Sequence, residues 1–456
     1  MTTTDPTKPI ETIETIETIE TTETSKPVET ETIETTASAP APAAATPNAA
    51  TPGPVPVPAA TVTNSSIQLI GQGGFGCVYY RGFDSTGKIM SPVYVTKLAI
   101  LETTQETEMG KLISRMPGYD AFFNTVVETQ PIDLAVLAPE TKDQCKVIKR
   151  FAEKNPGVEP EFQILKQLYV PHVTLLDFVK RRGIFMDAAQ TYHIHASDRA
   201  SRVNRGISAV TYSVPRFVNT MINCYEHVLM AIARMQAESE VVHYDIKIQN
   251  VVLNVYTKTP IILDFGLSFS IRDVRAVLDD SAVSDFEKVL RLKTFFYGYH
   301  PDYAPWAIET HIISFLVNEA HEIARNTDGS GDGSTPASLT VPVLTVENLT
   351  DMLTMFVDGS EYLREQPEPV KRAYFNKAIQ TYSQSAVGKP GLQVIRNYIF
   401  GEDGNAWRKW EIYSAATLIL DMMEEMNKAY KPFEIEPYKK EIDAFCTSLK
   451  IDGNYI

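Results

Sequence analysis

The segment 241–253, VVHYDIKIQNVVL, sets four polar side chains between two apolar runs. These are His243, Asp245, Lys247 and Asn250, and burying such groups is costly unless they have partners or a task. Asp245 can accept a proton from a hydroxyl group, and Lys247 can neutralise a phosphate. The oxygen of Asn250 is a hard ligand of the kind that magnesium prefers. We therefore expect this cluster to carry out phosphoryl transfer.

A fifth polar residue, Asp264, follows nineteen positions after Asp245 in the sequence ILDFG. It stands at the end of an expected strand, before Phe265 and Gly266, and its carboxylate is a second candidate ligand for magnesium. A polar loop that caps a hairpin would explain any one of these residues. It would not explain five polar residues at these spacings and in this order, which favours a catalytic cluster.

Glycines dominate the segment 71–78, GQGGFGCV. Because glycine has no Cβ, the backbone N–H groups of such a loop can approach phosphate oxygens. An ordinary glycine turn is the common alternative. Here the chain continues as strand through Val78 and Tyr80 rather than as a helix, which favours a hairpin that covers a nucleotide. The residues expected to contact the nucleotide are Gly71, Gly73, Gly74, Phe75, Gly76 and Val78.

Lys97 lies in the next expected strand, in the sequence YVTKL. An exposed strand lysine is the ordinary interpretation, but this one stands between Val95 and Leu98, where it could reach the α- and β-phosphates. It would then need a carboxylate as a partner. Glu106 shares a helix face with apolar residues and should point inward, and Glu108 is the alternative.

The elements that position these residues fall into two groups. Apolar segments punctuated by glycine predict strands at 66–72, 76–83, 90–99, 124–132 and 162–169, with a helix at 103–116. Later segments are mostly helical, among them 213–238 and 410–423, and the second of these is apolar nearly all round and should be buried. A strand-rich first part and a helical second part predict an α+β protein in two lobes.

Charge and composition set the limits of these lobes. The 456-residue chain has a formal charge of −15, of which −7 falls in residues 1–63. That segment is rich in Glu and Thr and then in Ala and Pro, and it is expected to be a disordered tail. We expect a small β-rich lobe at 64–172 and a larger helical lobe at 173–456, with insertions at about 181–212 and 307–409.

Several classes of protein are disfavoured. No apolar run approaches the length of a membrane span, the N-terminus has no basic-then-apolar signal, and an acidic chain lacks the basic footprint of a nucleic-acid binder. The four cysteines, Cys77, Cys145, Cys224 and Cys446, have no paired spacing, so we expect neither a zinc site nor a disulfide framework. Such cysteine usage is typical of a reducing compartment, and the prediction is an intracellular protein.

In combination, these motifs resemble those of the eukaryotic-type protein kinases, over about residues 66–306 and 409–425. The resemblance makes Lys97 the strand-three lysine, Glu106 its helix partner and Val95 a residue above the adenine. It implies a bilobal fold, ATP and Mg²⁺ as cofactors with Asn250 and Asp264 as metal ligands, and a protein as substrate. Lys247, two residues after Asp245, is the serine/threonine-kinase pattern.

This sequence also departs from the kinase pattern. Tyr244 stands where an arginine normally receives an activation-loop phosphate, so we expect that route of control to be absent. Trp306, in YAPW at 303–306, stands where the kinase pattern has a glutamate that forms an ion pair. Glu309 is the candidate to replace that glutamate. Glu411 replaces an aspartate that accepts backbone hydrogen bonds from the catalytic loop, and a longer carboxylate can still do so. The divergent pattern is similar to the protein kinases of large nucleocytoplasmic DNA viruses.

The sequence thus predicts a serine/threonine protein kinase, located in the cytoplasm, or in the host cytoplasm or virion if viral. A pseudokinase that binds nucleotide and partners without turnover is the alternative from another class. A small-molecule kinase ranks last, because such enzymes generally lack the Asp-x-Lys and Asp-Phe-Gly combination. The threonines of the acidic tail are candidate self-phosphorylation sites.

Overall fold

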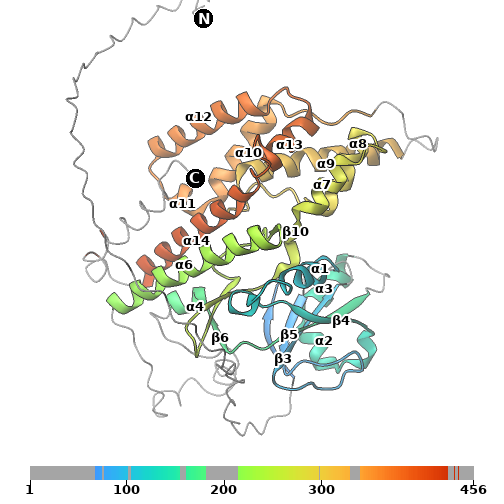
Figure 1. The fold of residues 1–456 in the computed structure, drawn as a ribbon, viewed down its shortest axis with the longest axis vertical. Helices are drawn as coiled ribbons and strands as arrows, with labels where there is room; N and C mark the ends of the chain where they lie inside the picture. The colour runs from blue at the N-terminus through green and yellow to red at the C-terminus, as the bar shows by residue number, and fades with distance from the viewer. Residues whose placement is uncertain are drawn as a thin grey trace, which may run out of the picture. The chain divides into compact units, whose positions relative to one another are not determined.

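The computed structural model describes residues 67–73, 76–100, 104–154, 161–180, 214–296, 298–328 and 339–429, with residues 436 and 440 (Figure 1). The chain divides into two units, Met1–Thr63 and Asn64–Ile456, and all described residues belong to the second. The predicted disordered tail and the predicted insertion at 181–212 lie outside the described residues.

A five-stranded antiparallel sheet forms the first part of the described chain. Its strand order is β1-β2-β3-β5-β4, so the last two strands are exchanged relative to their order in the sequence. The strands are β1 Gln68–Gln72, β2 Gly76–Tyr80, β3 Tyr94–Ile100, β4 Val126–Ile132 and β5 Phe162–Leu168. All five predicted strands are therefore confirmed, and the predicted helix at 103–116 is α1, Thr104–Ile113.

The two faces of this sheet serve different purposes. One face buries Cys77, Leu98 and Ile164 in a cluster with Cys145, which follows α2, Pro139–Gln144, and with Val147 of α3, Lys146–Lys154. Because side chains alternate along a strand, Lys97 lies on the opposite face, which also receives Glu106 of α1. The sheet thus separates a purely structural core from the side that carries charged groups.

Helices dominate the second part. A three-stranded antiparallel sheet, β6 His172–Thr174, β8 Val251–Asn254 and β9 Pro260–Ile262, and a short pair, β7 Val241–Val242 with β10 Phe269–Ser270, lie among them. The described helices are α4 Leu175–Lys180, α6 Val214–Glu238, α7 Ile271–Asp279, α8 Asp285–Arg291, α9 Ile308–Asp328, α10 Val346–Gly359, α11 Glu361–Arg364, α12 Glu368–Ser385, α13 Gly391–Phe400 and α14 Arg408–Ala429. The α+β class is confirmed, and so are the predicted helices at 213–238 and 410–423.

Two apolar clusters hold the helical part together. One joins α4, α6 and α14 to β8 and β9, and most residues of the segment 410–423 in α14 are buried, as its composition predicts. The other is built largely from α9, α10 and α13, which fill the segment predicted as an insertion at 307–409. Within the described part of the chain, no helix is long and apolar enough to cross a membrane.

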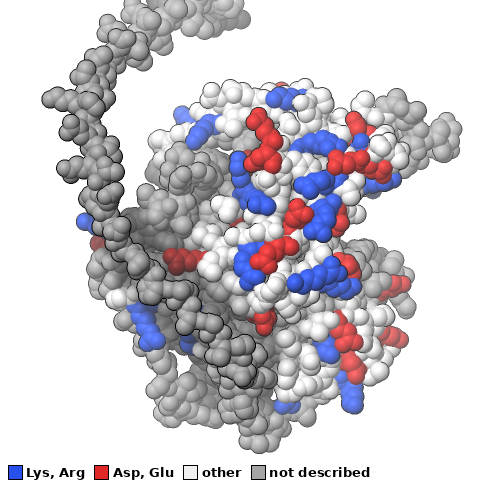
Figure 2. Space-filling model, viewed as in Figure 1, with Lys and Arg blue, Asp and Glu red and all other residues white. Residues whose placement is uncertain are grey.

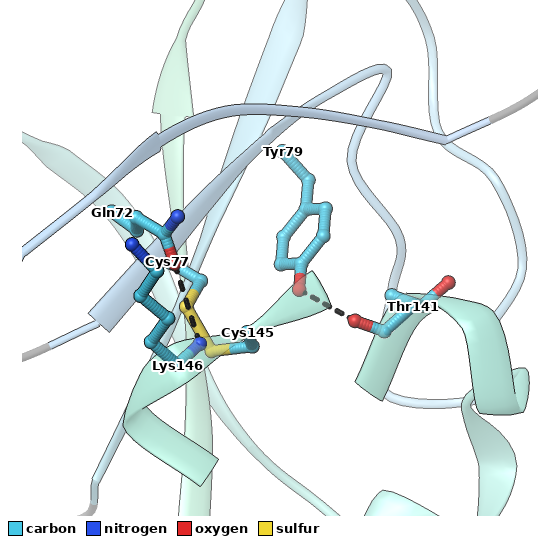
Figure 3. The surroundings of a disulfide bond; sticks show 6 residues. All are labelled: Gln72, Cys77, Tyr79, Thr141, Cys145 and Lys146. Atoms are coloured by element: carbon cyan, nitrogen blue, oxygen red, sulfur yellow. Dashed lines mark hydrogen bonds between the residues drawn. A yellow bond between two sulfur atoms is a disulfide. The ribbon is translucent and has the colours of Figure 1, made fainter. Parts of the chain in front are cut away.

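A disulfide bond joins Cys77 to Cys145, and this corrects the sequence-based expectation of none (Figure 3). The two cysteines are 68 positions apart, but β2 and the α2–α3 junction meet, so their Cα atoms lie 5.8 Å apart. Nearby, the hydroxyl of Tyr79 donates to the carbonyl oxygen of Thr141 at 2.9 Å. The linear spacing of cysteines reveals none of this, and the argument for a reducing compartment loses its basis.

The other two cysteines are not part of this bond. Cys224 is a buried free thiol on α6, and burial raises its pKa to about 12. Cys446 lies outside the described residues.

Candidate active site

Lys97 of the large sheet contacts two carboxylates. One is on α1, and the other follows β9 and thereby connects the sheet to the helical part. Its Nζ lies 2.7 Å from Oε2 of Glu106 on α1 and 2.7 Å from Oδ1 of Asp264, which follows β9. Burial opposes the charge of Lys97, but Asp264 and Glu106 outweigh it, so the pKa of Lys97 is raised. Of the two candidates left open by the sequence, Glu106 is the partner, while exposed Glu108 pairs with Lys111.

The pKa values of the two carboxylates of this cluster are shifted in opposite directions. Burial, together with the charge of Asp264, raises the pKa of Glu106 even though Lys97 lowers it. At Asp264 burial acts in the same sense, but the charge of Lys97 overcomes it and the pKa is lowered. Asp264 therefore stays ionised, and its side chain is 38% exposed, which leaves it accessible to a ligand.

Asp245, Lys247 and Asn250 form a second cluster. Lys247 donates to Oδ2 of Asp245 at 2.9 Å, and the side-chain amide of Asn250 donates to the same oxygen at 2.7 Å. The amide also donates to the backbone carbonyl of Asp245, so its oxygen is left facing away from the aspartate. The backbone N–H of Leu263 donates to the carbonyl of Asn250 at 2.9 Å, which brings Asn250 next to the residue before Asp264.

His243 is fully buried, and its two ring nitrogens form hydrogen bonds that hold this loop. The N–H of Asp245 donates to its Nδ1 at 3.2 Å, so Nε2 carries the proton and donates to the carbonyl of Leu263 at 3.0 Å. Burial lowers its pKa, which keeps the ring neutral. A neutral ring fixes the spacing between the loop that carries Asp245 and the segment that leads to Asp264.

Glu411 of α14 anchors the same loop from the helical side. Its Oε1 accepts a hydrogen bond from the backbone N–H of Tyr244 at 2.9 Å. The expectation that a carboxylate longer than aspartate still reaches the loop is confirmed. Burial raises the pKa of Glu411 to about 7.

Two residues of the site have backbone angles that side chains rarely adopt. Tyr244 has φ of 65° and Asp264 has φ of 66°. Such left-handed conformations cost about 1–3 kcal/mol and persist only when surrounding contacts hold them. Here Glu411 holds the N–H of Tyr244 and Lys97 holds the side chain of Asp264. Strain at these two positions is typical of a functional site.

The glycine segment lies at the β1–β2 turn. Gly71 and Gly76 lie in the two strands, and the N–H of Gly73 donates to the carbonyl of Gly76 at 3.0 Å. A Cβ on Gly76 would come within 2.6 Å of the carbonyl oxygen of Leu98, so a glycine is required for the close approach of β2 to β3. Gly74 and Phe75 lie outside the described residues.

Val78 and Val95 share the face of the sheet that carries Lys97. Val78 pairs directly with Lys97 across the strands, and Val95 stands two positions before it. The sheet therefore offers an apolar surface beside the lysine.

Aromatic side chains pack around the loop that carries Asp245. The ring of Tyr244 stacks on Trp306 with 4.5 Å between centroids, and the indole N–H donates to the carbonyl of Tyr244 at 2.7 Å. Glu309, the candidate to replace the ion-paired glutamate, accepts a hydrogen bond from the hydroxyl of Tyr382 at 2.9 Å.

Sequence reasoning missed one residue of the site, Tyr303. Its hydroxyl donates to Oδ1 of Asp245 and accepts from Nζ of Lys247, the latter at 2.9 Å. Nothing in the spacing around YAPW singles out this tyrosine, since its ring reaches Asp245 only through the fold.

No family model matches the chain, and no curated protein matches it. The case for a function therefore rests on the residues and geometry described above.

Proposed function

We propose that this protein is a serine/threonine protein kinase that transfers the γ-phosphate of ATP to a protein hydroxyl. In this proposal the sheet region, 64–172, is the small lobe and 173–456 the large lobe of a bilobal kinase-like fold. The observation that carries it is the contact of Lys97 with both Glu106 and Asp264, at 2.7 Å each, next to the cluster around Asp245.

Three independent parts of the sequence contribute to that arrangement. Lys97 comes from β3, Glu106 from α1 and Asp264 from the segment after β9. One carboxylate would be enough to neutralise the charge of a buried lysine. The second carboxylate is therefore an additional charge, and burying ions is costly. A site that must hold a polyphosphate and its metal gives such a cluster a purpose.

The donor set fits magnesium. Asp264 offers an ionised and partly exposed carboxylate, and Asn250 offers the amide oxygen that its hydrogen bonds leave available. Magnesium usually binds proteins through one or two such groups plus phosphates and water. When bound, it would neutralise charge on the transferring phosphate.

The chain's own residues then have distinct roles. Lys97 would bind the α- and β-phosphates, with Glu106 fixing its direction. Asp245 would orient the acceptor hydroxyl and take its proton, while Lys247, held against it, would balance the charge of the γ-phosphate. The β1–β2 turn, with Gly71, Gly73 and Gly76, would cover the phosphates.

A labelled-phosphate assay tests the proposal. The full chain, with Mg²⁺, radiolabelled ATP and a basic test protein, should incorporate phosphate on serine or threonine. Asp245→Asn should lower the rate by about two to four orders of magnitude, because it removes the proton acceptor. Asp285→Asn, the same change at an exposed position on α8, should leave the rate unchanged.

Two results would contradict the proposal. One is equal incorporation by the wild type and Asp245→Asn. The other is nucleotide binding by the wild type, seen as a thermal shift, without any transfer. That second result would favour the pseudokinase alternative.

A further inference from the structure

The disulfide bond joins two parts of the large sheet region that are far apart in the strand order. Cys77 lies in β2, whereas Cys145 lies between α2 and α3, in the connection from β4 to β5. The strand order is β1-β2-β3-β5-β4, so this connection begins and ends in the two strands furthest from β1. The bond therefore cross-links the β1–β2 hairpin to the other end of the sheet.

Two hydrogen bonds accompany the covalent link (Figure 3). The hydroxyl of Tyr79 in β2 donates to the carbonyl of Thr141 in α2 at 2.9 Å. The side-chain oxygen of Gln72, the last residue of β1, accepts from the backbone N–H of Lys146 at 3.3 Å. Both strands of the hairpin thus contact the α2–α3 unit, residues 139–154.

The α2–α3 unit packs through a small set of side chains. Thr141, Cys145 and Val147 are the buried residues within 139–153. The two helices have six and nine residues, and helices that short are not stable alone in water. Side chains of both charges lie on the exposed surface of the sheet region (Figure 2). The unit is therefore held from its inner side, and the bond to Cys77 is central to that attachment.

The cross-linked strand also borders the charged cluster. Gly76 and Val78 flank Cys77, and Val78 pairs with Lys97 of β3. A Cβ on Gly76 would lie 3.2 Å from Cγ of Lys97. Because side chains alternate along a strand, the sulfur of Cys77 is on the face opposite Lys97. The bond thus fixes the backbone next to Lys97 without entering the site.

We propose that the Cys77–Cys145 bond is a redox-sensitive cross-link that holds the β1–β2 hairpin in position for a nucleotide, so that its reduction to two thiols weakens nucleotide binding. The inference rests on the proposed function for the nucleotide, but the hold on the hairpin does not. A loop that is already rigid in its bound conformation binds more tightly, because it loses less conformational freedom on binding. The two cysteines are therefore positioning residues.

The reductant for this step is a dithiol, such as dithiothreitol. One of its thiolates attacks a sulfur of the bond, forms a mixed disulfide and releases the other cysteine as a thiolate. The second thiol of the reagent then displaces the first cysteine and closes an oxidised ring. Two electrons pass to the protein, and the two thiol protons of the reagent end on the two cysteines. Both cysteines are fully buried, so the attack requires local opening of the α2–α3 unit.

Hydrogen exchange of the full chain measures the hold on the hairpin without any ligand. After reduction, the amides of β1 and β2 should exchange about tenfold faster or more, while those of β8 should be unchanged. Reoxidation should restore slow exchange, and the double variant Cys77→Ala, Cys145→Ala should match the reduced wild type with or without reductant. Equal exchange of the hairpin in both redox states, or an equal increase in β8, would overturn the hold.

Calorimetric titration with ATP and Mg²⁺ measures the consequence for binding. Reduction should weaken the affinity about five- to tenfold in the wild type, because the hairpin must then be ordered on binding. Cys224→Ala is the matched control, since it lacks a buried thiol but keeps the bond and should respond in the same way. The double variant should not respond. By reciprocity, ATP should shift the thiol–disulfide equilibrium in a glutathione buffer toward the disulfide by the same factor.

The outcomes separate this inference from the function on which it rests. If neither redox state binds ATP, the kinase proposal fails together with the effect on binding, and the exchange data still decide whether the bond holds the hairpin. If the oxidised protein binds ATP and reduction changes its affinity by less than about twofold, the redox-sensitive role is overturned and the kinase proposal stands.

Discussion

The carboxylate of Glu411 and the backbone N–H of Tyr244 are hydrogen-bonded at 2.9 Å across 167 positions of the chain. This bond ties α14 to the loop that carries Asp245. Glu411 is 1% exposed, and its second oxygen, Oε2, has no hydrogen-bond partner among the described residues. A buried and incompletely satisfied carboxylate is stabilised in its neutral form, and burial accordingly raises its pKa to about 7.

The raised pKa of Glu411 predicts that stability falls as pH rises. Between pH 4.5 and 7 the folded protein keeps a proton on Glu411 that the unfolded chain has released, so raising the pH favours unfolding. Glu411→Gln keeps an acceptor for the Tyr244 N–H and cannot ionise. The free energy of unfolding of wild type relative to Glu411→Gln should drop by roughly 2 kcal/mol from pH 5 to pH 8.

Urea unfolding of both proteins at several pH values measures this difference. Other buried groups, among them His243 and Glu106, also titrate abnormally, but they are common to both proteins and cancel in the comparison. A difference that is flat from pH 5 to pH 8 would show that Glu411 is already ionised at pH 5 in the folded state.

Lys97→Met should destabilise the fold as well as impair phosphate transfer. The change leaves Glu106 and Asp264 without their shared cation, and breaking a buried ion pair costs about 3–5 kcal/mol. Adding Glu106→Gln should recover part of the loss. Lys166→Met is the control, because Lys166 pairs with Glu128 at the surface and its loss should cost less than about 1 kcal/mol. Equal free energies of unfolding for the two lysine variants would contradict the structural role of Lys97.

The sequence predicted the sheet and the charged cluster because both depend on local patterns. Glycine breaks and apolar runs located all five strands, and the inward helix face of Glu106 favoured it over Glu108. The polar residues Lys97, Asp245, Asn250 and Asp264 stood out because they interrupt apolar segments. Each of these signals lies within a few residues of the position that it marks.

Contacts between distant segments left no such signal. The Cys77–Cys145 bond depends on how α2 and α3 pack against β2, and the reach of Tyr303 to Asp245 depends on α10 and α14 holding the segment before Trp306. The helices of the segment 307–409, which was predicted as an insertion, form one of the main cores together with α7 and α8. Tertiary packing, which linear spacing does not encode, decides all three.

The disulfide between Cys77 and Cys145 should contribute strongly to stability. It closes a segment of 68 residues, for which the loss of loop entropy in the unfolded chain amounts to about 4 kcal/mol. Dithiothreitol should therefore lower the melting temperature of the wild type. The double variant Cys77→Ala, Cys145→Ala should melt at the lower temperature with or without reductant, whereas Cys224→Ala should still respond to it. A wild-type melting temperature that ignores reductant would mean that the bond does not form in solution.

The hydrogen bond from Trp306 to Tyr244 offers a final test of how the loop that carries Asp245 is held. Trp306→Phe removes the indole N–H that donates to the carbonyl of Tyr244 at 2.7 Å, and leaves that carbonyl buried without its donor. The loss should cost about 1–3 kcal/mol beyond the change in packing. Trp407→Phe is the matched control, because the Trp407 indole is also buried but its N–H has no partner among the described residues. Chemical denaturation of both variants measures the difference, and Trp306→Phe should also reduce phosphate transfer, since Tyr244 directly precedes Asp245. If the two variants lose the same stability and both retain wild-type transfer, the indole contributes only volume and the loop is held by its other contacts, among them Glu411 and His243.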